Sequence, residues 1–177
     1  AAVENLSHLE YLSELTTLEC AARREGRIKR LVNRSKLPPD KTWDSFKFDR
    51  LPLYVTQQLQ TLRDGSFLKR RENVLLFGKP GSGKSHALCA LAEQLIFQGH
   101  SILFTTCGLL VQQLLLAKRD LRLPKMIKQL SSFEGLIIDD LGYVQQTREE
   151  MEVLFTLLAE RYERGSVLLT SNLAFSK

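Results

Sequence analysis

The chain has 177 residues, a formal net charge of +5 and 44% hydrophobic residues. This is enough for one α/β domain with its own core, together with a smaller appendage. No apolar run approaches the roughly 18 residues that a membrane span requires, and no secretory signal is present. The three cysteines, Cys20, Cys89 and Cys107, are too scattered for a disulfide framework. These features exclude membrane-spanning and disulfide-stabilised classes, and we expect a cytoplasmic protein.

Residues 3–35 are expected to form a helix, because leucines recur at every third position from Leu6 to Leu18. The excess positive charge lies in residues 23–36, which hold seven basic residues and one acid. Four arginines spaced by four and three residues share one face of this helix: Arg23, Arg27, Arg30 and Arg34. Such a row suits a phosphate backbone, so these four and Arg24 are the predicted nucleic-acid contacts. A solvated surface face is the alternative.

A proline pair ends this helix. In Leu37-Pro38-Pro39-Asp40 the rings cannot continue a helix, and they also restrict the residue before them. We therefore divide the chain into a helical, basic segment, residues 1–39, and a larger domain, residues 40–177. Because the sequence lacks an initial Met and stops just after an apolar strand, we expect a fragment of a longer protein.

Residues 73–92, NVLLFGKPGSGKSHALCALA, place a glycine-rich loop between an apolar strand and a mostly apolar helix. The loop matches G-x-x-x-x-G-K-[ST] at every fixed position. Its glycines let backbone N–H groups approach phosphate oxygens, and the helix N-terminus favours an anion. Lys84 can reach the β- and γ-phosphates, and the Ser85 hydroxyl can bind Mg²⁺. The predicted nucleotide-binding residues are Gly78, Lys79, Pro80, Gly81, Ser82, Gly83, Lys84, Ser85 and His86.

Three aromatic residues, Trp43, Phe46 and Phe48, precede the loop strand. They can pack on the adenine of a bound nucleotide or on the protein core, and the sequence favours neither.

Polar residues follow two further apolar strands. Leu136-Ile137-Ile138 leads into Asp139 and Asp140, and residues 166–170 lead through Ser171 into Asn172. In an open α/β sheet, ligands bind at the carboxyl ends of the strands. We therefore expect Asp139 to hold Mg²⁺, and Asp140 and Asn172 to position the attacking water, with Lys84 as the third catalytic residue.

From residue 73 onward, strands alternate with helices. The expected strands after the loop cover residues 101–105, 136–140 and 166–170, and the expected helices cover residues 108–118, 124–130 and 148–164. This alternation predicts an α/β P-loop NTPase with a parallel, doubly wound sheet and helices on both faces. A GTPase would carry an Asn/Thr-Lys-x-Asp motif, and a small-molecule kinase would not need a leading basic helix. The combination favours an ATPase that acts on nucleic acid.

Three stretches carry a more specific resemblance: GKPGSGKSHALCALA, LIIDDLGY and LLAERYERGSVLLTSNLAFSK. They resemble the IstB family, AAA+ ATPases that accompany the transposase of bacterial insertion sequences and are relatives of DnaC helicase loaders and DnaA initiators. The resemblance spans residues 42–177 and is loose before residue 42. It implies a Walker A motif at residues 78–85, a Walker B aspartate at Asp139 and a sensor I residue at Asn172.

The resemblance further implies ATP and Mg²⁺ as cofactors, ATP-dependent oligomerisation on double-stranded DNA, and recruitment and stimulation of a partner transposase. Asp140 stands where AAA+ proteins commonly have Glu, so we expect slow hydrolysis of ATP to ADP and phosphate. The arginine finger and the sensor II arginine would lie beyond Lys177, and we expect Arg161 and Arg164, on the helix before the last strand, to be surface or subunit-contact residues. A DnaC-like helicase loader and a scaffold that binds ATP without hydrolysis remain the alternatives.

Overall fold

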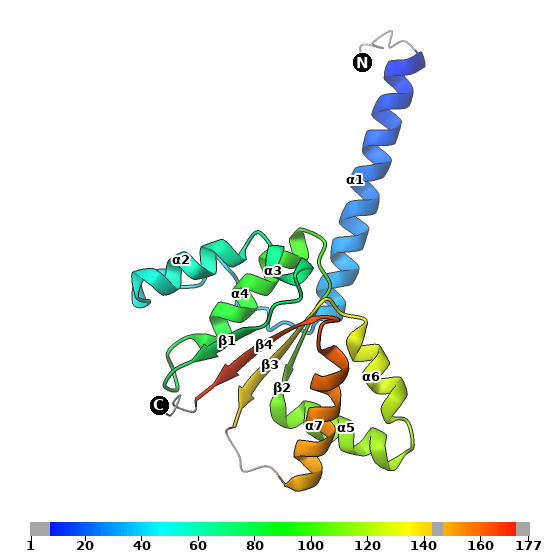
Figure 1. Ribbon diagram of the computed structural model, residues 1–177. Coiled ribbons are helices and arrows are strands. Elements are labelled where there is room, and N and C mark those ends of the chain that lie inside the picture. The colour runs from blue at the N-terminus through cyan, green and yellow to red at the C-terminus, as the bar shows by residue number, and fades with distance from the viewer. Residues whose placement is uncertain (1–7, 143–146, 173–177) are drawn as a thin grey trace.

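A long N-terminal helix projects from a compact α/β body (Figure 1). The computed structural model describes residues 8–142 and 147–172. Helix α1, His8–Ser35, extends away from the sheet for most of its length, and only its C-terminal part packs against the body. Its leucines at positions 9, 12, 15 and 18 are therefore exposed, and Leu31 is the first to pack against the core.

Four parallel strands form one sheet among the described residues, in the order β1-β4-β3-β2. This confirms the predicted parallel α/β fold. The strand bounds are β1 Val74–Phe77, β2 Ile102–Thr106, β3 Gly135–Leu141 and β4 Ser166–Ser171. Strand β4 lies between β1 and β3, so its carboxyl end lies between the glycine-rich loop after β1 and the acids at the end of β3.

Helices cover both faces of the sheet (Figure 1). The helix and 3₁₀ bounds are η1 Phe48–Arg50, α2 Leu53–Leu62, α3 Ser66–Lys69, α4 Lys84–Phe97, α5 Cys107–Arg119, α6 Leu123–Ser131 and α7 Arg148–Arg161. Side chains alternate along each strand, so Ile137 packs towards α3 and α4, whereas Leu136 and Ile138 pack towards α5 and α7. Both faces of the central strands are buried, which is why their sequences read as continuous apolar runs.

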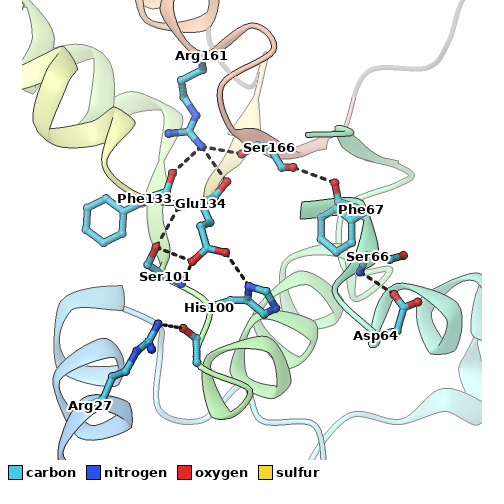
Figure 2. A network of polar contacts seen from close by, with 11 residues as sticks. Arg27, Asp64, Ser66, Phe67, His100, Ser101, Phe133, Glu134, Arg161 and Ser166 are labelled. Atoms are coloured by element: carbon cyan, nitrogen blue, oxygen red, sulfur yellow. Dashed lines mark hydrogen bonds and ion pairs between the residues drawn. The ribbon is translucent and has the colours of Figure 1, made fainter. Parts of the chain in front are cut away.

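A buried arginine joins the N-terminal ends of β3 and β4 to α6 and α7 (Figure 2). The Arg161 guanidinium donates to the carbonyls of Leu130 at 2.9 Å, Phe133 at 3.1 Å, Glu134 at 3.3 Å and Ser166 at 2.9 Å. Arg161 is 1% exposed. The expectation that Arg161 is a surface or subunit-contact residue is therefore wrong. Arg164 lies on the surface beside Glu160, where we placed it.

The basic row on α1 is partly occupied by contacts within the molecule. Arg27 donates to the Gly99 carbonyl at 3.1 Å, and the Arg34 guanidinium lies 5.0 Å from the centre of the Phe133 ring. Arg23 pairs with Glu19 one turn earlier. All five arginines retain exposed surface, but the end of the row at Arg27 and Arg34 faces the α/β body.

In the part of the chain that the structure describes, no helix has the length and apolar character needed to cross a bilayer. Cys20 is exposed, whereas Cys89 and Cys107 are buried. Burial raises the pKa of the Cys89 thiol to about 12, so this group stays protonated at neutral pH.

Candidate nucleotide-binding site

The glycine-rich loop connects β1 to the first turn of α4. The Gly78 N–H donates to the Ser171 carbonyl at 3.3 Å, so the loop leaves the sheet beside the end of β4. Gly81 and Gly83 have φ angles of 77° and 88°, which are in the left-handed region that only glycine adopts at little cost. Helix α4 then begins at Lys84 and directs its first N–H groups back towards the loop. The sequence motif thus produces the expected strand, loop and helix.

The Lys84 ammonium lies at the centre of this loop. Its Nζ donates to the Gly78 carbonyl at 2.7 Å, to the Lys79 carbonyl at 2.9 Å and to Asn172 Oδ1 at 2.7 Å. Lys84 and Asn172 are 88 positions apart in the sequence. The structure therefore brings together the loop lysine and the amide that follows β4, as expected from the position of both at the carboxyl ends of parallel strands.

The two acids at the end of β3 lie in different environments. Asp139 is 4% exposed, and its Oδ1 accepts a hydrogen bond of 2.5 Å from Thr170 Oγ1. Asp140 is exposed and has a φ angle of 59°. Its N–H donates to the same Thr170 oxygen at 2.8 Å. One carboxylate is thus held inside the sheet, and the next is turned outwards.

These residues fit a magnesium-bound triphosphate. In the described residues, no three His, Cys, Asp or Glu side chains gather into a site that could hold a metal on its own. Mg²⁺ in nucleotide sites requires less, because phosphates and water supply most of its six oxygen ligands. The Ser85 hydroxyl and the Asp139 carboxylate are oxygen donors of the type it prefers, and they are the residues that would hold it.

The His86 side chain faces away from the phosphate loop. Its Nε2 lies 3.1 Å from Ser45 Oγ and 3.2 Å from the Thr42 carbonyl, and its ring packs edge-on against Phe46. Only the backbone N–H of His86 can therefore serve a phosphate. The imidazole instead fastens the segment before α2 to the start of α4.

The aromatic residues before the loop pack with the core. Phe46 is 9% exposed and contacts both Phe48 and the α4 surface, and Trp43 packs beside them. The backbone N–H of Trp43 also donates to Glu93 Oε2 of α4 at 2.8 Å. These side chains therefore pack on the core, which is one of the two alternatives that the sequence left open.

Sequence reasoning missed Thr170, which bonds to both acids. The available signal was its position two residues before Asn172, which places both side chains on the same side of β4. A threonine inside an apolar strand reads as an ordinary β-former, so the pattern gave no reason to select it.

Comparison with known proteins identifies the family. The sequence profile described as IstB-like ATP binding protein matches residues 1–177. The chain belongs to this family. An insertion sequence ATP-binding protein of Sinorhizobium fredii is 42% identical over 168 residues, which is 94% of this chain and 56% of that protein. The IS21 ATP-binding protein of Pseudomonas aeruginosa is 35% identical over 176 residues, or 99% of this chain and 66% of that protein. This IstB-like chain thus spans between half and two thirds of these relatives.

Solved structures show the same fold. DnaA from Aquifex aeolicus, solved with AMPPCP, has a TM-score of 0.67 at 15% identity and covers 78% of this IstB-like chain and 44% of that chain. The DnaC helicase loader has a TM-score of 0.65 at 18% identity, with coverage of 78% and 81%. The resemblance to IstB proteins and the relationship of the fold to DnaA and DnaC are confirmed.

Proposed function

We propose that this IstB-like chain carries a DNA-binding segment and the ATPase domain of a regulator that assembles on double-stranded DNA and recruits and stimulates a transposase. The observation that carries the proposal is the contact of Lys84 with Asn172 at 2.7 Å, because it joins the phosphate loop to the strand that also contacts Asp139. The names of the relatives, which are insertion sequence ATP-binding proteins, support the transposition context.

Each residue of the site has a defined task in this proposal. The N–H groups of the loop and Lys84 bind the phosphates, and Ser85 and Asp139 hold Mg²⁺. When bound there, Mg²⁺ would neutralise charge that develops on the phosphates during hydrolysis. Asp140 and Asn172 orient the attacking water for hydrolysis. Because Asp140 has a shorter side chain than glutamate, we expect this step to be slow.

The N-terminal segment, residues 1–39, is the proposed DNA-binding part, and residues 40–177 are the proposed ATPase part. The arginines of α1 supply the positive charge for this contact. Among them, Arg24 and Arg30 are exposed. Nucleotide binding between neighbouring copies would align these helices along one duplex. ATP binding, more than its turnover, is then the signal for assembly.

Replacement of the loop lysine tests the coupling of ATP and DNA. We expect Lys84→Ala to lower ATP affinity at least about 100-fold, because it removes the cation that faces the phosphates. ATP-dependent retention on a 50-base-pair duplex should be lost with it. Lys69→Ala, which removes an exposed lysine of α3, is the matched control. Normal ATP-dependent DNA retention in Lys84→Ala would contradict the proposal.

A helicase loader is the second candidate, because the fold covers 81% of the DnaC helicase loader. The two candidates differ in the nucleic acid that they recognise. We expect duplex DNA to stimulate ATP hydrolysis by the full-length protein more than single-stranded DNA of the same length does. Greater stimulation by single strands would favour the loader. A rate that no DNA changes, and that Asp140→Asn leaves unaltered in a single turnover, would indicate a scaffold.

A further inference from the structure

An irregularity in the sheet lies beside the two acids. Ile138 pairs with Leu169, but Leu141 pairs with Ser171, so β3 contains one residue more than β4 over this step. Asp139 and Asp140 together therefore stand opposite Thr170. A β-bulge of this kind interrupts the backbone ladder, bends the strand and redirects a side chain, and bulges are frequent next to active sites.

The Thr170 hydroxyl provides a hydrogen-bond partner for the backbone at the bulge. It accepts the Asp140 N–H at 2.8 Å and donates its single proton to Asp139 Oδ1 at 2.5 Å. Thr170 is 0% exposed, so no solvent competes for these bonds. Because a hydroxyl has only one proton and both partners are defined, its orientation is fixed. The Thr170 side chain thus accepts the backbone N–H of Asp140 at the bulge and orients the Asp139 carboxylate.

The bulge also accounts for the different placement of the two acids. Asp140 has a φ angle of 59°, a left-handed conformation that costs a non-glycine residue free energy and needs support from its surroundings. The bond from its N–H to Thr170 supplies that support. Without it, a polar group next to the sheet interior would lack a partner, and the strand could relax towards a regular ladder that turns Asp140 elsewhere.

We propose that Thr170 is a positioning residue of the nucleotide site, which sets the orientation of Asp139 towards Mg²⁺ and of Asp140 towards the attacking water. The inference rests on the proposed ATP site and adds a residue to it. Thr170 itself contacts neither phosphate nor metal in this role. It acts through the two acids.

Thr170→Val keeps the shape of the side chain and removes the hydroxyl. The probe is AMPPCP binding, measured by calorimetry on the full-length protein over a series of Mg²⁺ concentrations. We expect the Mg²⁺ concentration for half-maximal binding to rise about 10-fold or more, as is usual when a residue that orients a metal ligand is changed. Affinity for AMPPCP in EDTA should stay within about threefold of wild type, since the loop and Lys84 are intact.

Two variants serve as controls. Thr170→Ser keeps the hydroxyl and should restore the Mg²⁺ dependence of wild type. Thr105→Val removes a buried hydroxyl of β2, the strand on the other side of β3. This hydroxyl donates to the Thr106 carbonyl at 3.3 Å, and its loss should leave the Mg²⁺ dependence unchanged. If Thr170→Val does not fold, Thr170→Cys retains a side chain with a weak donor and should give an intermediate shift. Wild-type Mg²⁺ dependence in a folded Thr170→Val or Thr170→Cys protein would overturn the proposal.

Amide hydrogen exchange gives a readout that needs no nucleotide. We expect the Asp140 N–H to exchange about 10-fold faster or more in Thr170→Val than in wild type, while the amides of β1 keep their protection. Equal exchange at Asp140 would also overturn the proposal. If wild type binds no nucleotide at all, the proposed function fails, whereas this measurement still decides whether Thr170 holds the bulge.

Discussion

The ammonium of Lys84 uses all three of its N–H bonds within the protein. Two acceptors are backbone carbonyls of the loop, and the third is the Asn172 side chain. A phosphate oxygen that binds Lys84 has to replace at least one of them. Asn172 is the acceptor that can move by a side-chain rotation alone, so it is the group that we expect to yield.

Asn172→Ala tests this competition. Removing the acceptor should strengthen ADP binding about fivefold, because a net hydrogen bond contributes about 1 kcal/mol. The same change should slow ATP hydrolysis, since Asn172 no longer positions the water. Asn172→Asp is the contrasting variant, because its charge would bind Lys84 more tightly and repel phosphate, and it should weaken ADP binding. Fluorescent ADP titration measures both, and weaker ADP binding in Asn172→Ala would contradict this role.

At the scale of single residues, the sequence was informative where one motif dictates a backbone geometry. Gly81, Gly83, Lys84 and Ser85 could be placed because the loop, its flanking strand and its helix are all encoded locally. Thr170 could not be placed, because its role depends on a bulge in a strand 30 positions away. Register between distant strands is set by packing, and a single sequence does not display it.

Arg161 links helix α7 to the N-terminal ends of β3 and β4. The guanidinium bonds to four carbonyls, and burial lowers its pKa to about 10, so the group remains charged at neutral pH. The buried face of α7 consists of Val153, Leu154 and Leu157, and position 161 continues it by one turn. This spacing was a usable signal. The charge of arginine argued against burial, because few arginines are fully buried without a partner.

We expect Arg161→Met to lower the free energy of unfolding by about 3 kcal/mol, because three buried carbonyls and one partly buried carbonyl lose a charged donor. Arg164→Met is the matched control, three residues further along the chain. Arg164 is exposed and pairs with Glu160, so its loss should change stability by less than about 0.5 kcal/mol. Urea denaturation followed by circular dichroism measures both variants. Equal stability of the two variants would show that the carbonyl contacts of Arg161 contribute little.

At the scale of the whole molecule, charge is distributed unevenly between the projecting helix and the body. Residues 23–36 contribute a net charge of about +6 to a chain whose formal net charge is +5, so the remainder is close to neutral. The α/β fold could be predicted in full outline, since its strands are apolar on both faces. The partial docking of α1 onto the body could not be predicted. It depends on the hydrogen bond of Arg27 to the Gly99 carbonyl and on the contact of Arg34 with the Phe133 ring, and the pattern of the helix reveals neither.

Arg24 and Arg30 test the DNA interaction without disturbing this docking, because both are exposed and lie outside the contacts of Arg27 and Arg34. We expect the double change to Gln to weaken binding to any duplex sequence and to reduce the slope of log affinity against log salt by about 2. ATP affinity should not change. The control is the double change of Lys69 and Arg70 to Gln, which removes the same charge from α3 and its end. An unchanged slope would identify the α1 row as a solvated face.

The reach of α1 follows from its length. With 28 residues, the helix is about 42 Å long. It is attached only near its C-terminal end, where Arg27 meets the turn after α4 and Leu31 enters the core. A tilt of about 10° at Arg27 would carry His8, about 29 Å away along the helix, through about 5 Å, which is between one and two base-pair steps of a duplex. A small rotation where α1 meets the body therefore produces a larger displacement at the N-terminal end of the helix.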